Sequence, residues 1–180
     1  MYSKEETKQM SMDFWEGFKK YSAPKRRKSG KNREWILQKT GVKTIALKFD
    51  LQKNKALVGV EVFHRDKYLE GLYYEKFECL RGILKDAFGD AFIWQPDYVS
   101  EEGRQFAFIY VEKEQVSIHK PETWNAAYRF FYDNMMKLEE IFVEYKDFIK
   151  EIELWFFLTI LFHKNLYLCR PKFLIELNHL

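Results

Sequence analysis

The sequence predicts an α+β fold in which two antiparallel β-hairpins are interleaved with three helices, in the order α-β-β-α-β-β-α. Two pairs of segments alternate apolar and polar residues, and each pair is joined by a polar turn. Apolar residues at helical spacing precede, separate and follow these pairs. Because hairpins rather than single strands alternate with the helices, we expect a mainly antiparallel four-stranded sheet. A hydrophobic content of 47% over 180 residues is ample for a core.

The first predicted helix covers residues 4 to about 21. Ser3 and Glu6 have the S-x-x-E spacing of a capping box, in which both side chains bind free amides at a helix start. Pro24 follows, and we expect "APKRRKSGKN" to form a polar loop. The apolar positions at helical spacing are Met10, Phe14, Phe18 and Tyr21.

The first hairpin pairs "TIALKFDL" with "ALVGVEVF" across the turn "QKNK". A tight turn at residues 53–54 places Ala46 opposite Glu61 and Lys48 opposite Gly59, with Lys48 diagonal to Glu61. We expect Gly59 to leave room for the lysine stem. The second hairpin pairs "FIWQPDYVS" with "QFAFIYVE", and Pro96 makes its first strand an edge strand or a bulged one.

Two further helices are predicted, over residues 68–88 and from Pro121 to about residue 152. The last has a spacing of 3.5 residues, but its aromatic positions favour packing on the sheet over a coiled-coil seam. We expect residues 1–150 to form one α+β domain. Residues 151–180 are an extension of uncertain structure, for which a packing helix, a dimerisation arm and a shifted reading frame are open alternatives.

Several stretches resemble an uncharacterised bacterial family. They include "FWEGFKKY", "KTGVKTIALKFD", "IYVEKEQVSIHKPETW" and "MMKLEEIFVEYKD". The family is domain of unknown function number four-two-six-eight, and the resemblance covers residues 1–150 but not 151–180. Its members occur alone or at the C-terminal end of proteins whose other half resembles a nuclease. The resemblance therefore implies a DNA-processing or defence context and a nuclease-like partner protein, by analogy alone.

The weak catalytic candidates are Glu61, Asp50 and Lys48, which lie on the first hairpin as in nucleases of the PD-(D/E)xK type. In those enzymes carboxylates hold Mg²⁺, which activates water. The predicted register puts Asp50 four residues along the strands from Glu61, and Phe63 stands where the motif has lysine. We therefore favour an ion pair of Glu61 with Lys48. No metal or other cofactor is expected, apart from Mg²⁺ in the nuclease alternative.

Positive charge is concentrated in residues 19–33, which contain eight basic residues and no acid. The chain as a whole has a net charge of only +3, so the remainder is acidic. A basic loop can neutralise phosphates without reading sequence, and aromatic residues beside it can stack on bases. The alternative is a solvated surface loop. The predicted nucleic-acid-binding residues are Lys25, Arg26, Arg27, Lys28, Lys31, Arg33 and Trp35.

These patterns favour a non-catalytic nucleic-acid-binding or interaction module. The alternatives are a divergent Mg²⁺-dependent nuclease and a homo-oligomeric module that dimerises through the long helix or the tail.

The longest apolar run, residues 154–162, falls short of the roughly 20 residues that span a bilayer. Cys79 and Cys169 lie far apart and form no CxxC pair, and no secretory segment opens the chain. We therefore expect a cytoplasmic protein without membrane contact.

Overall fold

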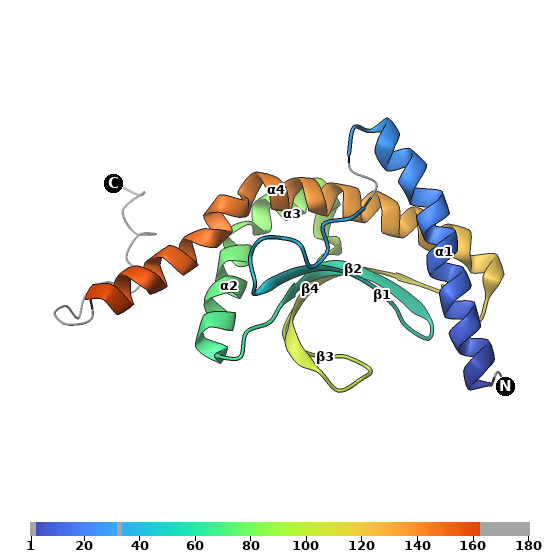
Figure 1. Cartoon of the computed structure of the whole chain (residues 1–180), viewed down its shortest axis with the longest axis horizontal. Coiled ribbons are helices and arrows are strands. Elements are labelled where there is room, and N and C mark those ends of the chain that lie inside the picture. Colours follow the sequence, from blue (N-terminus) through green and yellow to red (C-terminus); the bar gives the residue numbers. More distant parts are fainter. Residues whose placement is uncertain (1–2, 32–33, 163–180) are drawn as a thin grey trace. The chain divides into compact units, whose positions relative to one another are not determined.

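The computed structural model describes residues 3–31 and 34–162, with side chains up to residue 152. The chain divides into two compact units, Met1–Ile149 and Lys150–Leu180. The features below belong to the first unit (Figure 1). Its elements, and the helix that continues beyond it, are α1 (Lys4–Lys28), β1 (Ile45–Leu51), β2 (Lys55–Val62), α2 (Lys67–Cys79), α3 (Arg81–Phe88), η1 (Gly89–Ala91), β3 (Ile93–Val99), β4 (Gln105–Glu114), η2 (Pro121–Thr123) and α4 (Trp124–Phe162).

The four strands form one antiparallel sheet in the order β1-β2-β4-β3. Ala46 lies opposite Glu61 and Lys48 opposite Gly59, which is the predicted register. β3 is an edge strand, and its pairing shifts between Gln95 and Tyr98, on either side of Pro96. The predicted α+β class, both hairpins and the irregular edge strand are therefore confirmed.

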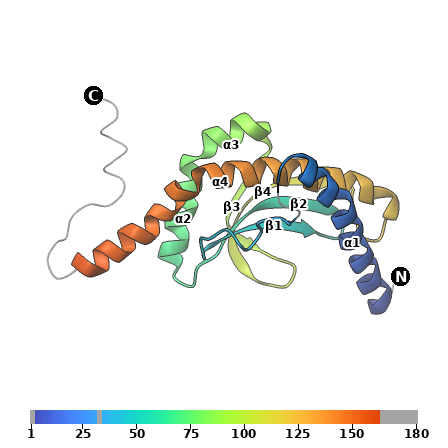
Figure 2. The ribbon, with the colours of Figure 1, turned by 45° about the horizontal axis from the view of Figure 1, so that its top comes forward.

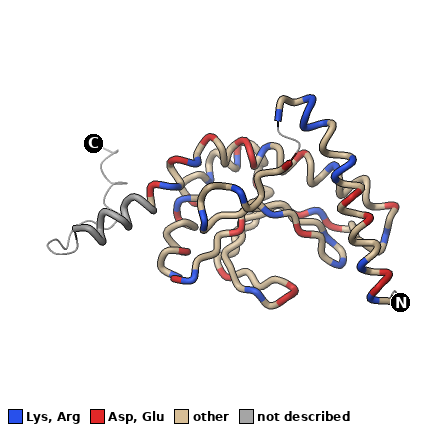
Figure 3. Tube along the Cα trace, viewed as in Figure 1, with Lys and Arg blue, Asp and Glu red and all other residues tan. Residues whose placement is uncertain are grey.

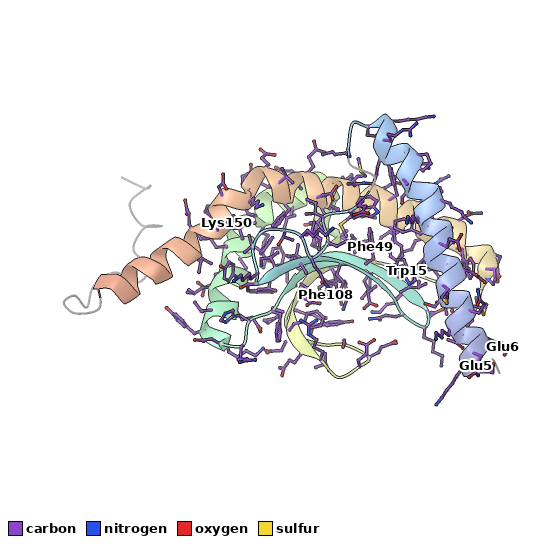
Figure 4. The ribbon with its side chains drawn as sticks, viewed as in Figure 1. Glu5, Glu6, Trp15, Phe49, Phe108 and Lys150 are labelled. Atoms are coloured by element: carbon purple, nitrogen blue, oxygen red, sulfur yellow. The ribbon has the colours of Figure 1, made fainter. Side chains whose placement is uncertain are left out.

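One face of the sheet is covered by α1 and α4 (Figures 1 and 2). Phe49 of β1 lies 5.1 Å from Phe18 of α1 and 5.1 Å from Phe131 of α4, measured between ring centroids. Trp15 stacks on Phe131 at 5.7 Å, and Figure 4 shows Trp15 and Phe49 on this helix side of the sheet. Aromatic pairs at such distances add stability beyond the area they bury. The aromatic residues of the long helix therefore pack on the sheet, as predicted.

Close contact between α1 and α4 requires a glycine. The hydroxyl of Tyr128 donates to the carbonyl of Phe14 at 3.0 Å. A Cβ atom at Gly17 would overlap that hydroxyl group, at 2.3 Å from the oxygen. Gly17 therefore lets the tyrosine reach the α1 backbone, although glycine weakens a helix interior.

The other face of the sheet has an aromatic cluster of its own. Phe106, Phe108 and Tyr110 of β4 are buried there, and Tyr98 of β3 packs against them. Gln52, directly after β1, donates to the Tyr98 hydroxyl at 2.6 Å. Because β1 and β3 are the two outer strands, this bond requires the sheet to curl towards this face. Phe108 is seen on this side in Figure 4.

The first helix is longer than predicted. Both halves of the capping box form at its start, since Ser3 N donates to Glu6 Oε2 at 2.7 Å and Glu6 N to Ser3 Oγ at 3.1 Å. The predicted end at residue 21 and the polar loop after it are wrong, because α1 continues through Pro24 to Lys28. It ends where Gly30, with a φ of 73°, takes the left-handed conformation that glycine allows. Lys31 N then donates to the carbonyl of Arg26, and Gly30 N to that of Arg27.

Two other boundaries differ from the prediction. The helix expected over residues 68–88 is interrupted at Leu80, whose amide bonds the carbonyl of Phe77 in a tight turn. Leu80 and Leu84 are both buried. The last helix begins at Trp124 rather than Pro121, because Pro121–Thr123 form a short 3₁₀ turn. No helix within residues 3–31 and 34–162 is long and apolar enough to cross a membrane.

A buried ion pair holds the end of α1 against α4. The Arg26 and Glu139 side chains are 2% and 3% exposed, and Arg26 Nη1 lies 2.6 Å from Glu139 Oε2. Arg26 Nη2 also donates to the carbonyl of Glu34, and Glu139 Oε1 accepts from the amide of Ile36. The guanidinium lies 3.9 Å from the ring centroid of Trp35. Two helices and the segment between α1 and β1 therefore meet at one pair of charges.

This pair explains why the helix continues past a proline. Proline inside a helix removes one backbone hydrogen bond and costs about 3 kcal/mol. Helix geometry beyond Pro24 is needed to bring Arg26 to Glu139, and ending the helix earlier would leave a buried carboxylate without its cation. Removing one partner of a buried ion pair costs about 3–5 kcal/mol. The tertiary contact therefore outweighs the local preference.

We predict that Glu139→Ala lowers the free energy of unfolding by about 3–5 kcal/mol, because it leaves the buried Arg26 charge unpaired. Urea denaturation followed by circular dichroism measures this change. Glu140→Ala, at an exposed position one residue along, is the matched control and should change the value by less than about 0.5 kcal/mol. Equal effects of the two substitutions would contradict the assigned role. The double variant Arg26→Met/Glu139→Leu should be more stable than Glu139→Ala.

Candidate functional site

The basic segment lies on the last turns of α1 rather than on a loop. Lys25, Arg27 and Lys28 are exposed there, and Lys31 is half-buried just after the helix. Figure 3 shows basic residues gathered at this end of α1. Arg33 lies outside the described residues. Three of the predicted phosphate contacts are therefore exposed together on one helix end.

Two predicted contact residues are instead part of the interior packing. Arg26 is only 2% exposed, and its guanidinium is bound by Glu139 and the backbone. Its burial contradicts a role in binding phosphate. The half-buried Trp35 ring lies parallel to Phe18 at 6.2 Å and against the Arg26 guanidinium. Because its neighbours occupy the ring, Trp35 supports the end of α1 and does not offer a free stacking surface.

The exposed cations are not neutralised by neighbouring acids. Among the described residues, no carboxylate lies within salt-bridge distance of Lys25, Arg27 or Lys28, whereas Lys20 pairs with Glu16 at 2.7 Å. The partial negative charge at a helix C-terminus favours cations there by about 0.3–1 kcal/mol each. The helix dipole therefore stabilises the charges of Lys25, Arg27 and Lys28, and their exposed ends can still bind an anion.

Lys25 also lies against aromatic side chains. Its ammonium is 3.6 Å from the ring centroid of Tyr21 and 5.5 Å from that of Tyr132 on α4. Both tyrosines are half-buried. A cation over the face of an aromatic ring is attracted by its quadrupole. The basic end of α1 therefore adjoins α4 through a lysine and two tyrosines.

Glu61 is held by two cations. Its side chain is 9% exposed, and the predicted pair with Lys48 is present at 3.6 Å between Nζ and Oε2. The second cation, Arg104, was not predicted from the sequence; its Nη2 lies closer, at 2.7 Å from Oε1. Arg104 directly precedes β4. Every second residue of a strand faces the same side of the sheet, so Arg104 faces the Glu61 side together with Phe106 and Phe108. That alternation is the signal that could have identified it.

The other nuclease candidates are not brought to Glu61. Asp50 lies opposite Leu57, four residues along the strands, and its carboxylate accepts from the Gln52 amide at 3.2 Å. Within the described part of the chain, no group of three or more acidic, histidine or cysteine residues could hold a metal ion. Gly59 leaves room for β4, since a Cβ there would overlap Tyr110 and the Ile109 carbonyl. The arrangement around Glu61 is thus an ion-pair network, with one carboxylate between two cations.

Three ionisable groups on this face of the sheet have a raised pKa. Burial raises the pKa of the Tyr98 and Tyr110 hydroxyls. The Tyr110 hydroxyl donates to Gln95 at 3.1 Å, which requires the protonated form. A hydrogen bond to Glu112 raises the pKa of Lys55, despite partial burial. These three groups are therefore far from the neutral pKa that suits a general acid or base.

We predict that Glu61 couples more strongly to Arg104 than to Lys48, because the shorter contact is a charge-assisted hydrogen bond. Double-mutant cycles with alanine, measured by urea denaturation, should give a coupling energy of roughly 1 kcal/mol for Glu61 and Arg104. The coupling of Glu61 with Lys48 should be only a few tenths of a kcal/mol, because their 3.6 Å separation is too long for a hydrogen bond. A larger coupling to Lys48 would overturn this ranking.

Comparison with known proteins places the chain in a family without an assigned activity. No curated protein and no solved structure matches it. Residues 10–146 match the family described as "Domain of unknown function (DUF4268)". The match covers the described fold from the first helix to the long last helix, including the exposed basic residues of α1. The chain is therefore a member of the DUF4268 family.

Proposed function

We propose that this domain is a non-catalytic nucleic-acid-binding module whose basic end of α1 contacts the phosphate backbone. The contact residues are Lys25, Arg27 and Lys28. The supporting observation is the burial of Arg26 between them. At 3.6 residues per turn, a side chain fixed inward at position 26 directs its neighbours at 25, 27 and 28 to the other sides of the helix.

The chemistry of this surface suits phosphate better than a folded acidic protein surface of fixed shape. Long cationic side chains on a helix end can adapt to phosphates at varying positions, and such contacts carry no sequence information. Binding of this kind releases counterions, so its affinity falls steeply with salt. The function we propose is therefore sequence-independent and salt-dependent.

The other functions considered have less support. Glu61 is enclosed by Lys48 and Arg104, and Asp50 is bound to Gln52 instead, so no observation favours a nuclease site on the first hairpin. Dimerisation through the long helix or the tail stays a prediction, and residues 163–180 lie outside the described residues. A cytoplasmic location, a defence context and a nuclease-like partner are likewise predictions that accompany the proposed function.

We predict that Lys25→Ala/Arg27→Ala/Lys28→Ala removes most of the affinity for nucleic acid at 50 mM salt. Each phosphate contact contributes about 0.7–0.9 to the slope of log affinity against log salt. The triple variant should flatten that slope by about 2. Fluorescence anisotropy with labelled 20-residue DNA strands and duplexes, over a range of sodium chloride, measures both quantities.

The matched control is Lys4→Ala/Lys8→Ala/Lys53→Ala, which removes three exposed lysines elsewhere and lowers the net charge equally. It should retain most of the affinity and nearly the full slope. If both triple variants weaken binding alike, the contact is diffuse and the assignment to α1 is wrong. If the unmodified chain binds neither strands nor duplexes at 50 mM salt, the proposed function itself is refuted.

A further inference from the structure

We infer that the bound nucleic acid is single-stranded, and that it continues from the basic end of α1 across α4 into a groove that contains Phe130. This inference rests on the proposed function and specifies its ligand. The groove has a volume of about 530 Å³ and is lined by residues of α4 and by Lys113 of β4. Lys113 and Arg129 supply two cations to its lining, against one acid, Asp133.

The groove has the side chains that an unpaired nucleotide needs. Phe130 is half-buried in its lining and offers an aromatic ring to a base. Asn125 is exposed beside it, and a side-chain amide can both donate to and accept from a base edge. Arg129 and Lys113 can bind the phosphates on either side. Stacking, edge recognition and phosphate binding are thus available within one groove.

The groove is connected to the basic end of α1 by neighbouring side chains. Lys25 lies 5.5 Å from the ring centroid of Tyr132 on α4. Arg129 precedes Tyr132 by three residues, and residues at this spacing are neighbours on a helix surface. Arg129 itself lines the groove. A strand bound at Lys25 therefore reaches the groove by passing Tyr132 and then Arg129 on the surface of α4.

The aromatic ring in the groove favours a single strand over a duplex as the ligand. In a duplex the bases are paired and stacked inside the helix, so an aromatic side chain in a shallow groove cannot stack on them. Unpaired bases can turn outward and stack on aromatic residues, and cations between the rings bind the phosphates. The Phe130 ring, with the cations Arg129 and Lys113 beside it, therefore suits an unpaired chain.

The test compares Phe130→Ala with the unmodified full chain, using labelled oligothymidylate of 20 residues and the same strand paired with oligoadenylate. Loss of one stacked base should weaken single-strand binding about fivefold or more. Duplex binding should be unchanged, and the unmodified chain should prefer the single strand. Phe130→Tyr should retain binding, since it keeps the ring, and circular dichroism verifies that each variant is folded.

Phe63→Ala is the matched control, because it removes an exposed phenylalanine that lies directly after β2 and outside the groove lining. It should leave binding unchanged. The inference is overturned if Phe130→Ala binds the single strand normally while the α1 triple variant loses binding, a result that leaves the proposed function intact. It is also overturned if the duplex binds as tightly as the single strand. Absence of all binding refutes the proposed function as well.

Discussion

The fold of the first unit depends on one buried ion pair, Arg26 with Glu139. Both charges are removed from water, so each requires the other. The backbone of Glu34 binds Arg26 Nη2, and the backbone of Ile36 binds Glu139 Oε1. Desolvation makes such a pair costly to form, and it is still more costly to break. Its value therefore lies in specificity: the end of α1 has one position against α4 in which both charges are satisfied.

The same pair divides the basic run into two kinds of side chain. Arg26 is used inside the fold, and the cations on either side of it are left at the surface, where no acidic residue in the described part of the chain pairs with them. An exposed charged segment would otherwise be free to vary in conformation, which costs entropy when it binds. Holding the helix end at α4 therefore orders Lys25, Arg27 and Lys28 before any ligand arrives. It also brings Lys25 beside Tyr132, next to the groove on α4.

Much of the fold could be predicted from the sequence, because alternation and turn length together determine strand register. That reasoning placed Lys48 diagonal to Glu61, as the structure has it. The prediction of the end of α1 was wrong, because a residue distant in the sequence determines where this helix ends. Pro24 is a local helix-breaking signal, and only Glu139, more than a hundred residues away, explains why the helix continues. The buried residues of α1 are Phe14, Phe18, Ser22 and Arg26, at a spacing of four. Because the prediction ended the helix at residue 21, it did not extend this spacing to Arg26.

Hydrogen exchange at the end of α1 tests this account most directly. If the ion pair holds the helix beyond Pro24, Glu139→Ala should accelerate amide exchange at residues 25–28 by about tenfold or more, beyond any change at residues 14–18. Glu140→Ala should leave both segments unchanged. If exchange at residues 25–28 is as slow in Glu139→Ala as in the unmodified chain, the helix end is maintained without the ion pair. That result would contradict the account.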